Sequence, residues 1–213
     1  MNNVSGDTLH TTSVFTESGN ISAVNTSMPP EKTAPGVFIS TSTDQTIALG
    51  NKLGKLLQPG DILVLTGDLG AGKTQLTKGI AGGMGISEDI TSPTFTIEMV
   101  YEGANMPLYH FDLYRLSDLN QLEDTGLYDA LESDGPTVIE WGEQFVEQIG
   151  PRTFDVYVSR LADELATNLL DETTINSSIG SLDDSSLSEV IEPRREIRFV
   201  PMNARGQEII AEL

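Results

Sequence analysis

Hydrophobic and polar positions divide the chain into segments of different character. Residues 1–36 are rich in Ser, Thr and Asn and show neither a helical nor a strand period. This composition predicts a disordered N-terminal tail, because too little apolar surface is present to offset the entropy of ordering. A short edge strand around Val14–Phe15 is the alternative. One ordered domain is predicted over residues 37–213.

Periodic order begins with "STSTDQTIALGNKLGKLLQPG", whose apolar stripe predicts a helix with Thr43 as N-cap and Pro59-Gly60 as its end. The next run, "DILVLTG", is short and continuously apolar, as in a strand buried on both faces. The segment "KTQLTKGIAGGMG" then predicts a second helix. A strand, a glycine-rich loop and a helix therefore follow one another directly.

The middle of the chain alternates between strand and helix patterns. "TFTIEMVYEG" and "PLYHFDLYRL" predict two strands around a Gly-Ala-Asn turn, and "SDLNQLEDTGLYDALESDG" predicts a helix. "PTVIEWGEQF" predicts a buried strand that ends in an acid, and "TFDVYVSRL" and "REIRFVPM" predict two alternating strands. Between these last two lies an acidic, Ser-rich stretch at residues 161–193 without Lys or Arg. We predict a mobile acidic insertion there; a solvated loop without a role is the alternative.

Charge and composition limit the function. The 213 residues include 12 Lys and Arg against 32 Asp and Glu, a formal net charge of −20, and such a surface repels nucleic acid and anionic membranes. The sequence has no Cys, which excludes disulfides, thiolate zinc sites and a Cys nucleophile. With His10 and His110 as its two histidines, it has no histidine-rich metal site. No segment resembles a signal peptide or a membrane span, so we expect a cytoplasmic protein.

The segment "GDLGAGKT" at residues 67–74 has the G-x-x-x-x-G-K-[ST] spacing of a phosphate-binding P-loop. Gly67, Gly70 and Gly72 allow backbone N–H groups to turn inward around phosphates. Lys73 is placed to reach the β- and γ-phosphates, and the hydroxyl of Thr74 to ligate Mg²⁺. The strand before the loop and the helix after it are the context that this motif requires.

Two acids are candidates to complete the site. Glu140 ends an apolar strand, where P-loop proteins place a carboxylate that holds the metal; an ordinary acid at a strand end is the alternative. In "YHFDLYR", His110, Asp112 and Tyr114 alternate to one face, which suits water positioning near a phosphate. The alternative is the polar outer face of a half-exposed strand. "TSPTF" at residues 91–95 is either a switch segment that senses the γ-phosphate or a turn.

Four segments in this order, "GDLGAGKT", "SPTF", "YHFDLYR" and "IEWGE", resemble the bacterial TsaE (YjeE) family of ATPases, over about residues 40–160 and again near residue 194. The resemblance implies an α/β P-loop NTPase fold with a mostly parallel central sheet flanked by helices. It also implies a role in the threonylcarbamoyl modification of adenosine 37 in tRNA, together with a TsaD-like transferase subunit and its TsaB-like paralogue. ATP hydrolysis, weak without these subunits, would reset the complex between turnovers. The −20 charge argues that these partners hold most of the tRNA.

The resemblance also assigns site residues. It implies ATP and Mg²⁺ as cofactors, Lys73 and Asp112 as the residues tied to hydrolysis, and Thr74 and Glu140 as the metal residues. The residues expected to bind nucleotide are Asp44, Asp68, Leu69, Gly70, Ala71, Gly72, Lys73, Thr74, Gln75 and Arg195, with Arg194 as the alternative to the last. Gln75 departs from the second hydroxyl residue found in many relatives, and the tail and the insertion have no clear counterpart in short members.

Three other functions compete with this hypothesis. A regulatory GTPase would carry N-K-x-D after the P-loop, whereas "NKLG" at residues 51–54 precedes the P-loop and lacks the Asp. A P-loop small-molecule kinase is the stronger alternative, but it usually needs lid arginines, and Arg115 is the one cationic residue between Lys78 and Arg152. A nucleotide-binding interaction module with little turnover differs from the ATPase only in degree.

Overall fold

The computed structural model describes residues 29–150, 154–162 and 192–213. Most of the predicted tail, residues 1–28, lies outside these ranges, as do residues 163–191 of the predicted insertion. Both therefore stay predictions. Among the described residues, none of the helices is both long and apolar enough to cross a membrane.

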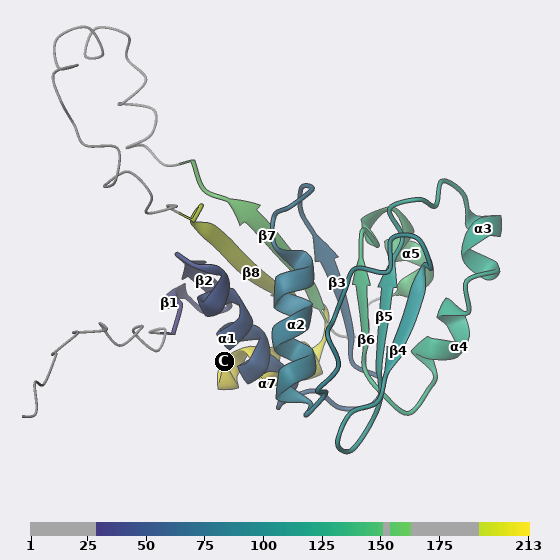
Figure 1. Ribbon diagram of the computed structural model, residues 1–213, viewed down its shortest axis with the longest axis horizontal. Coiled ribbons are helices and arrows are strands. Elements are labelled where there is room, and N and C mark those ends of the chain that lie inside the picture. The colour runs from purple at the N-terminus through teal and green to yellow at the C-terminus, as the bar shows by residue number, and fades with distance from the viewer. Residues whose placement is uncertain (1–28, 151–153, 163–191) are drawn as a thin grey trace, which may run out of the picture.

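An eight-stranded sheet with the order β1-β2-β8-β7-β3-β6-β5-β4 forms the centre of the molecule (Figure 1). Its strands are β1 (Glu31–Ala34), β2 (Val37–Ser40), β3 (Ile62–Thr66), β4 (Glu98–Tyr101), β5 (Leu108–Asp112), β6 (Thr137–Glu140), β7 (Phe154–Arg160) and β8 (Arg195–Pro201). The four central strands β7, β3, β6 and β5 pair in parallel, and the remaining pairs are antiparallel. The predicted α/β P-loop fold with parallel central strands is confirmed.

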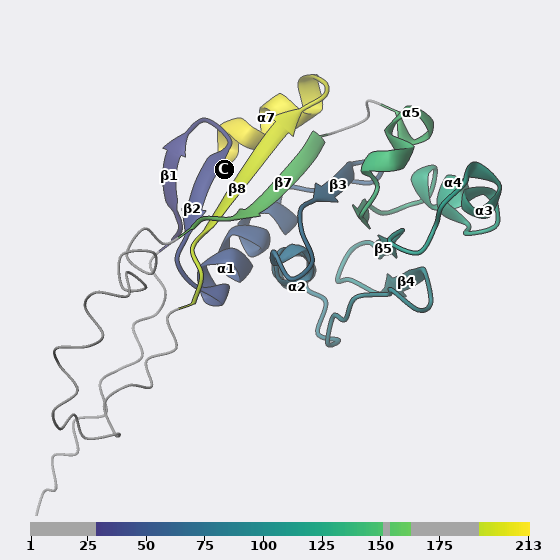
Figure 2. The same cartoon turned by 90° about the horizontal axis from the view of Figure 1, so that it is seen from above.

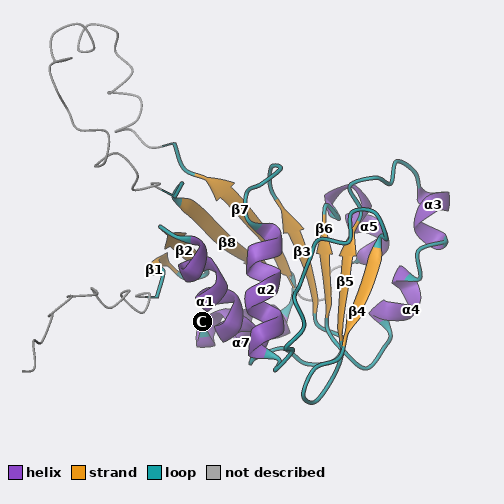
Figure 3. Cartoon of the chain, viewed as in Figure 1, coloured by secondary structure: helices purple, strands orange, loops and turns teal. Residues whose placement is uncertain are grey.

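Helices cover both faces of this sheet (Figure 3). They are α1 (Thr43–Gly54), α2 (Lys73–Gly83), α3 (Leu119–Glu123), α4 (Leu127–Leu131), α5 (Val146–Ile149), α7 (Ala204–Glu212) and the 3₁₀ turn η1 (Glu143–Phe145). Figure 2 shows α1 and α2 side by side on one face, with α5 and α7 toward the other. The core accordingly has two apolar clusters, a larger one beneath α1 and α2 and a smaller one that includes residues of α4 and α5.

The two helices on the larger cluster approach each other closely because glycines face each other at their contact. A Cβ atom on Gly50 of α1 would lie 2.3 Å from the carbonyl oxygen of Leu76, and one on Gly79 of α2 would lie 2.2 Å from that of Ile47. No larger residue fits at such distances without a backbone shift. This close contact brings the N-terminus of α1, at Thr43, beside the loop that precedes α2.

Several features of the fold differ from the sequence predictions. The predicted tail boundary at residue 36 is wrong for Glu31–Ala34, which form β1 against β2. All four of their side chains are exposed, so the pairing leaves no apolar pattern in the sequence. Ser42, not Thr43, is the N-cap of α1, because its hydroxyl accepts from the N–H of Gln45 at 3.2 Å.

The other differences concern helices. Helix α1 ends at Gly54 rather than at the predicted Pro59-Gly60, and η1 lies where a strand was predicted to end. The single helix predicted over "SDLNQLEDTGLYDALESDG" is divided into α3 and α4, because Gly126 between them has φ +79° and no longer continues a helix. Helix α7, at the C-terminal end of the chain, was not predicted. It begins at the N-cap Asn203, whose side chain accepts from the N–H of Gly206 at 2.9 Å.

The strand register sets the position of the candidate acids. Strands β5 and β6 pair with Asp112 opposite Glu140, and Leu65 of β3 pairs with Glu140 on its other side. All three strands run in the same direction, so their carboxyl ends meet at one edge of the sheet, where α/β proteins bind ligands. The loop after β3 is the "GDLGAGKT" segment, and it therefore lies directly beside both acids.

Candidate functional site

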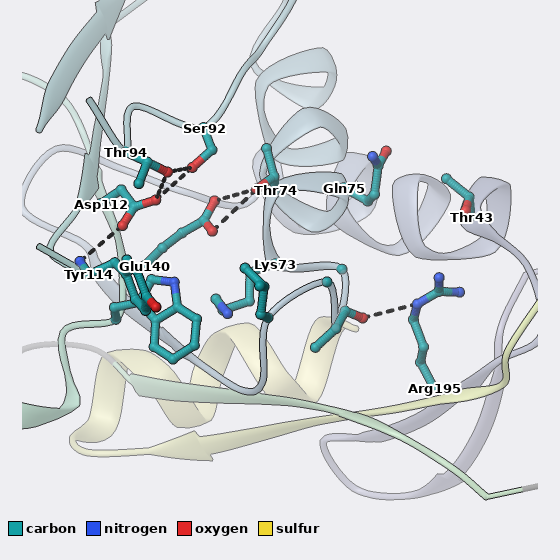
Figure 4. A pocket seen from close by; sticks show the side chains of 15 residues that line it. Thr43, Lys73, Thr74, Gln75, Ser92, Thr94, Asp112, Tyr114, Glu140 and Arg195 are labelled. Carbon is teal, nitrogen blue, oxygen red and sulfur yellow. Dashed lines mark hydrogen bonds between the residues drawn. The ribbon is translucent and has the colours of Figure 1, made fainter. Parts of the chain in front are cut away.

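A cavity of about 390 Å³ opens at this edge of the sheet (Figure 4). It is bordered by the loop before α2, by the ends of β5 and β6 and by the starts of α1 and β8. Its lining residues are Thr43, Leu69, Gly70, Ala71, Gly72, Lys73, Thr74, Gln75, Ser92, Thr94, Asp112, Tyr114, Glu140, Trp141 and Arg195.

The loop before α2 has the backbone that its glycines predict. Gly67, Gly70 and Gly72 have φ values of +153°, +71° and +114°, which residues other than glycine rarely adopt. Two arginines hold the outer carbonyl groups of this loop. Arg160 Nη2 donates to Gly70 O at 2.6 Å, and Arg195 Nε donates to Ala71 O at 3.0 Å. With these carbonyls turned outward, the loop has the form of a phosphate cradle at the N-terminus of α2.

Lys73 is almost fully buried and directs its ammonium group back at its own loop. Its Nζ donates to Gly67 O at 2.6 Å and to Asp68 O at 3.1 Å, and it lies 3.7 Å from the centre of the Trp141 ring. Burial lowers the pKa of this lysine, although nearby acids, Glu140 foremost, oppose the shift. The group is a desolvated cation that gains from an anionic partner.

Glu140 and Thr74 are in direct contact in the lining of the cavity. Thr74 Oγ1 donates to the carboxylate, at 3.0 Å from Oε1 and 3.2 Å from Oε2. His110 Nε2 lies 3.0 Å from the same Oε1, and Glu140 is only 3% exposed. The residue after Glu140, Trp141, has φ +61°, a conformation that is strained for a bulky side chain.

Asp112 is bound by hydroxyl groups of the "TSPTF" loop. Its Oδ2 accepts from Ser92 Oγ and from Thr94 Oγ1, both at 2.6 Å, and its Oδ1 accepts from the backbone N–H of Tyr114 at 3.0 Å. Asp112 and His110 are 2% and 0% exposed, so the alternative of a polar, half-exposed outer face is excluded for them. Tyr114 differs, because it lies beyond the end of β5 and is 56% exposed.

The start of α1 is tied to the residues just before β8. Glu192 accepts from the backbone N–H of Thr43 and, at 2.7 Å, from its Oγ1. These two hydrogen bonds, with a smaller contribution from Arg195, hold the pKa of Glu192 below its usual value. A carboxylate and a guanidinium group therefore lie together at the α1 end of the cavity.

The structure brings most of the predicted site residues together. Lys73, Thr74, Gln75, Asp112, Glu140 and Arg195 all line the cavity, as do residues 69–72 of the loop. Asp44 and Asp68 are exposed and do not line it; the neighbour of Asp44, Thr43, does. Arg194 is not a lining residue, so the structure favours Arg195 of the two.

Four residues of the site were missed from the sequence. Thr43, which lines the cavity, was expected only as a helix N-cap. Trp141 follows directly after Glu140 in "IEWGE", and its position beside the acid predicted to hold the metal was a usable signal. Arg160 and Glu192 carried none, because each depends on a partner distant in sequence. Arg160 comes near the loop because β7 pairs in parallel with β3, which leads into the loop, and Glu192 lies just before β8, which pairs with β7.

The chemistry of the cavity suits a phosphate with its metal ion. The described residues include no group of three or more His, Asp or Glu side chains that could hold a metal by themselves. Mg²⁺ usually takes one or two protein ligands and completes its shell with water and phosphate oxygens. Thr74 and Glu140 match that pattern, and Lys73 and Arg195 supply positive charge among the lining residues.

Comparisons with known proteins agree with this geometry. The model of the family "Threonylcarbamoyl adenosine biosynthesis protein TsaE" matches residues 40–169. The chain is 43% identical over 125 residues to a tRNA threonylcarbamoyladenosine biosynthesis protein TsaE of Treponema pallidum, covering 59% of this chain and 92% of the relative. It is 38% identical over 125 residues to that of Bacillus subtilis, covering 59% and 78%. The crystal structure of YdiB from that bacterium superimposes with a TM-score of 0.59 at 28% identity, covering 83% of this chain and 91% of the other. The chain thus belongs to the TsaE family, whose members take part in tRNA threonylcarbamoyladenosine biosynthesis.

Proposed function

We propose that this protein binds ATP with Mg²⁺ and hydrolyses it in support of the threonylcarbamoyl modification of adenosine 37 in tRNA. The observation that carries the proposal is the arrangement of Lys73, Asp112 and Glu140 around one cavity at the start of α2. A cation, a hydroxyl group beside a metal acid and a second buried acid are the parts that phosphoryl transfer to water requires.

Each residue has a separate task in this proposal. The backbone N–H groups of residues 70–74 hold the phosphates, and Lys73 leaves its two carbonyl partners to contact the β- and γ-phosphates. Thr74 and Glu140 would hold Mg²⁺, Glu140 through water, and the ion would neutralise charge on the phosphate oxygens. Asp112 orients the attacking water or couples the γ-phosphate to Ser92 and Thr94, with which it is already bonded.

Arg195 and the start of α1 contact the rest of the nucleotide in this proposal. Thr43 and Arg195 both line the cavity at the end away from Asp112 (Figure 4). A guanidinium group there can donate to phosphate or ribose oxygens. Asp44 and Asp68 are exposed and lie outside the lining of the cavity, so in this proposal they contact only the parts of the nucleotide that extend beyond it.

The proposal includes two protein partners, a TsaD-like transferase subunit and its TsaB-like paralogue. Hydrolysis is slow in the isolated chain and resets the complex between turnovers. The formal charge of −20 supports a division of labour in which the partners hold the tRNA, since this chain repels a polyanion.

Substitution of the P-loop lysine tests the proposal. Lys73→Ala should weaken binding of a fluorescent ATP analogue about 10- to 100-fold, because a hydrogen bond to a charged group contributes about 1.5–3 kcal/mol. Lys78→Ala is the matched control: Lys78 lies on the same helix but pairs with the exposed Asp89 at 3.2 Å. Equal affinities for the parent and Lys73→Ala would contradict the nucleotide site.

The role in the complex needs a second measurement. ATP hydrolysis by this chain should rise when the transferase subunit and its paralogue are added, and repeated turnovers of the tRNA modification should require both this chain and hydrolysable ATP. Equal modification of tRNA without this chain over many turnovers would remove the reset role but leave nucleotide binding standing.

A further inference from the structure

His110 lies in the core next to Glu140, the acid proposed to hold Mg²⁺. Its side chain is 0% exposed, and its Nε2 is 3.0 Å from Oε1 of Glu140. The Tyr101 ring lies on one side, with ring centres 6.5 Å apart and an interplanar angle of 35°. Its Nδ1, also buried, has no hydrogen-bond partner among the described residues.

A histidine at this depth is costly unless its polar atoms are used. Two apolar neighbours of His110 are both 0% exposed. Leu108 is the next residue on the same face of β5, and Val138 is the partner of His110 in the register with β6. An apolar side chain at position 110 would continue this cluster without leaving a buried nitrogen unpaired. The polar contact of His110 is therefore made entirely with Glu140.

The hydrogen bonds around the ring indicate its tautomer. Nε2 has a carboxylate oxygen as its partner and must donate to it, while Nδ1 has no acceptor for a proton within the part of the chain that the structure describes. The Nε2–H tautomer leaves only a lone pair unpaired, and this assignment follows from the network.

We infer that His110 is a positioning residue, which fixes the carboxylate of Glu140 toward Thr74; the inference rests on the proposed role of Glu140 at Mg²⁺. Two donors meet at this carboxylate. One of them, Thr74 Oγ1, donates to Glu140 here and is itself a candidate metal ligand, so it would change its partner if it held the ion. The other, His110 Nε2, is held in the core and keeps its direction. His110 therefore orients the acid in the presence and absence of the ion, as donors behind metal ligands commonly do.

Two substitutions at position 110 separate positioning from packing. His110→Gln can place an amide N–H near the position of Nε2, whereas the shorter His110→Asn places its amide near Nδ1, too far from Glu140. Both variants are polar and similar in size. Leu108→Val is the control for packing, because Leu108 lies on the same face of the same strand.

The measurement is the Mg²⁺ concentration that half-saturates binding of a fluorescent ATP analogue, with the affinity in EDTA and the thermal midpoint recorded for each protein. His110→Asn should raise the half-saturating Mg²⁺ concentration about tenfold, the lower end of the range for such donors. His110→Gln should restore it to within about threefold, about half of that tenfold change on a free-energy scale. The affinity in EDTA should not change.

The outcomes are distinct. If Gln and Asn shift the half-saturating Mg²⁺ concentration equally, or neither shifts it, the positioning role is overturned while the nucleotide site stands. A shift in Leu108→Val as large as that in His110→Asn also overturns it, because packing alone then explains the effect. If the parent protein binds the analogue equally well with and without Mg²⁺, the proposed metal site fails together with the inference.

Discussion

Glu140 and Asp112 end neighbouring strands opposite each other, yet different kinds of structure hold them. Glu140 is bound from α2 by Thr74 and from β5 by His110, both in regular elements of the core. Asp112 is bound by Ser92 and Thr94, which lie in a loop without regular structure. The two acids are almost equally buried, so burial does not distinguish them.

This difference suits two tasks. An acid fixed by core elements can hold an ion in one place, whereas an acid bonded to a loop can respond when the loop moves. The loop carries a strained residue, Ile97, with φ +69°, whose carbonyl accepts from the N–H of Asp112 at 3.0 Å. Strained backbone of this kind is often found at functional sites. We therefore expect substitutions of Asp112 and Glu140 to affect nucleotide binding and hydrolysis to different extents.

The largest effect is expected at Asp112. Asp112→Ala should retain ATP but lower single-turnover hydrolysis about 10²-fold or more, the scale for loss of one general-base or positioning group. Asp112→Asn keeps the size of the side chain and separates charge from packing. Hydrolysis at the parental rate, or failure to bind ATP, would erase the contrast between the two acids.

Glu140 should show a smaller and broader loss. Glu140→Ala should weaken Mg²⁺-dependent nucleotide binding and turnover together, each about tenfold, which corresponds to about 1.4 kcal/mol. Calorimetric titration with and without Mg²⁺ measures the first effect, with Glu140→Gln as the variant of matched size. Unchanged binding with reduced turnover would give Glu140 the role proposed for Asp112.

Loss of a hydroxyl group that donates to Asp112 should lower hydrolysis less than loss of either acid. Ser92→Ala removes one of the two 2.6 Å hydrogen bonds to Oδ2. Asp112 keeps its hydrogen bonds to Thr94 Oγ1 and to the N–H of Tyr114, so the net loss should be near the roughly 0.5–1.5 kcal/mol of an ordinary hydrogen bond, and hydrolysis should fall about two- to tenfold with ATP affinity kept. Thr91→Ala, in the same loop but without a hydrogen bond to Asp112 among the described contacts, should hydrolyse ATP at the parental rate. Equal losses in the two variants would point to the loop as a whole.

The smallest effect concerns Lys73, which lies in the same cavity as both acids. Because burial lowers the pKa of Lys73 below its usual 10.5, its charge reduces the stability of the nucleotide-free protein at neutral pH. Lys73→Met should therefore raise the thermal midpoint, and in a chain of this size each kcal/mol gained shifts the midpoint by about 2–4 °C.

The pH dependence checks the sign of this effect. The folded protein loses the Lys73 proton at lower pH than the unfolded chain does, so the parental stability rises in the range below 10.5 and the advantage of Lys73→Met should shrink there. A gap that widens with rising pH, or a lower midpoint for Lys73→Met at neutral pH, would show that the charge stabilises the fold.

The sequence predicted those parts of the site that local chemistry encodes. The P-loop spacing, the strand before it and the acid after a buried strand are each visible within a few residues. Parallel pairing then follows from the fold class, and it brings Glu140 beside Asp112. Hydrophobic periodicity could not predict the contact between Asp112 and the "TSPTF" loop, because it shows which face of a segment is buried but not which other segment packs there.

The missed parts depend on partners distant in the chain. Strand β1 has only exposed side chains and exists because β2 pairs with it. Arg160 and Glu192 reach the site through β7, β8 and the chain beside them. Their 32-residue separation in sequence therefore does not indicate that both lie near the same loop. The strained φ of Trp141 is likewise a property of its surroundings, since tryptophan has no preference for it.

The pairing of β7 with β8 also makes the domain a suitable host for an inserted protein. Arg160 lies opposite Arg195, and the N–H of Leu161 donates to Arg194 O at 2.8 Å, so the chain leaves and re-enters at adjacent points. The entropy of closing such an excursion grows with the logarithm of its length, and each doubling costs only about 0.6 kcal/mol. We therefore expect the domain to fold when a fluorescent domain with neighbouring termini replaces the residues between 162 and 192. Because Arg160 and Arg195 donate to Gly70 O and Ala71 O, such an insertion would join directly to residues that contact the glycine-rich loop.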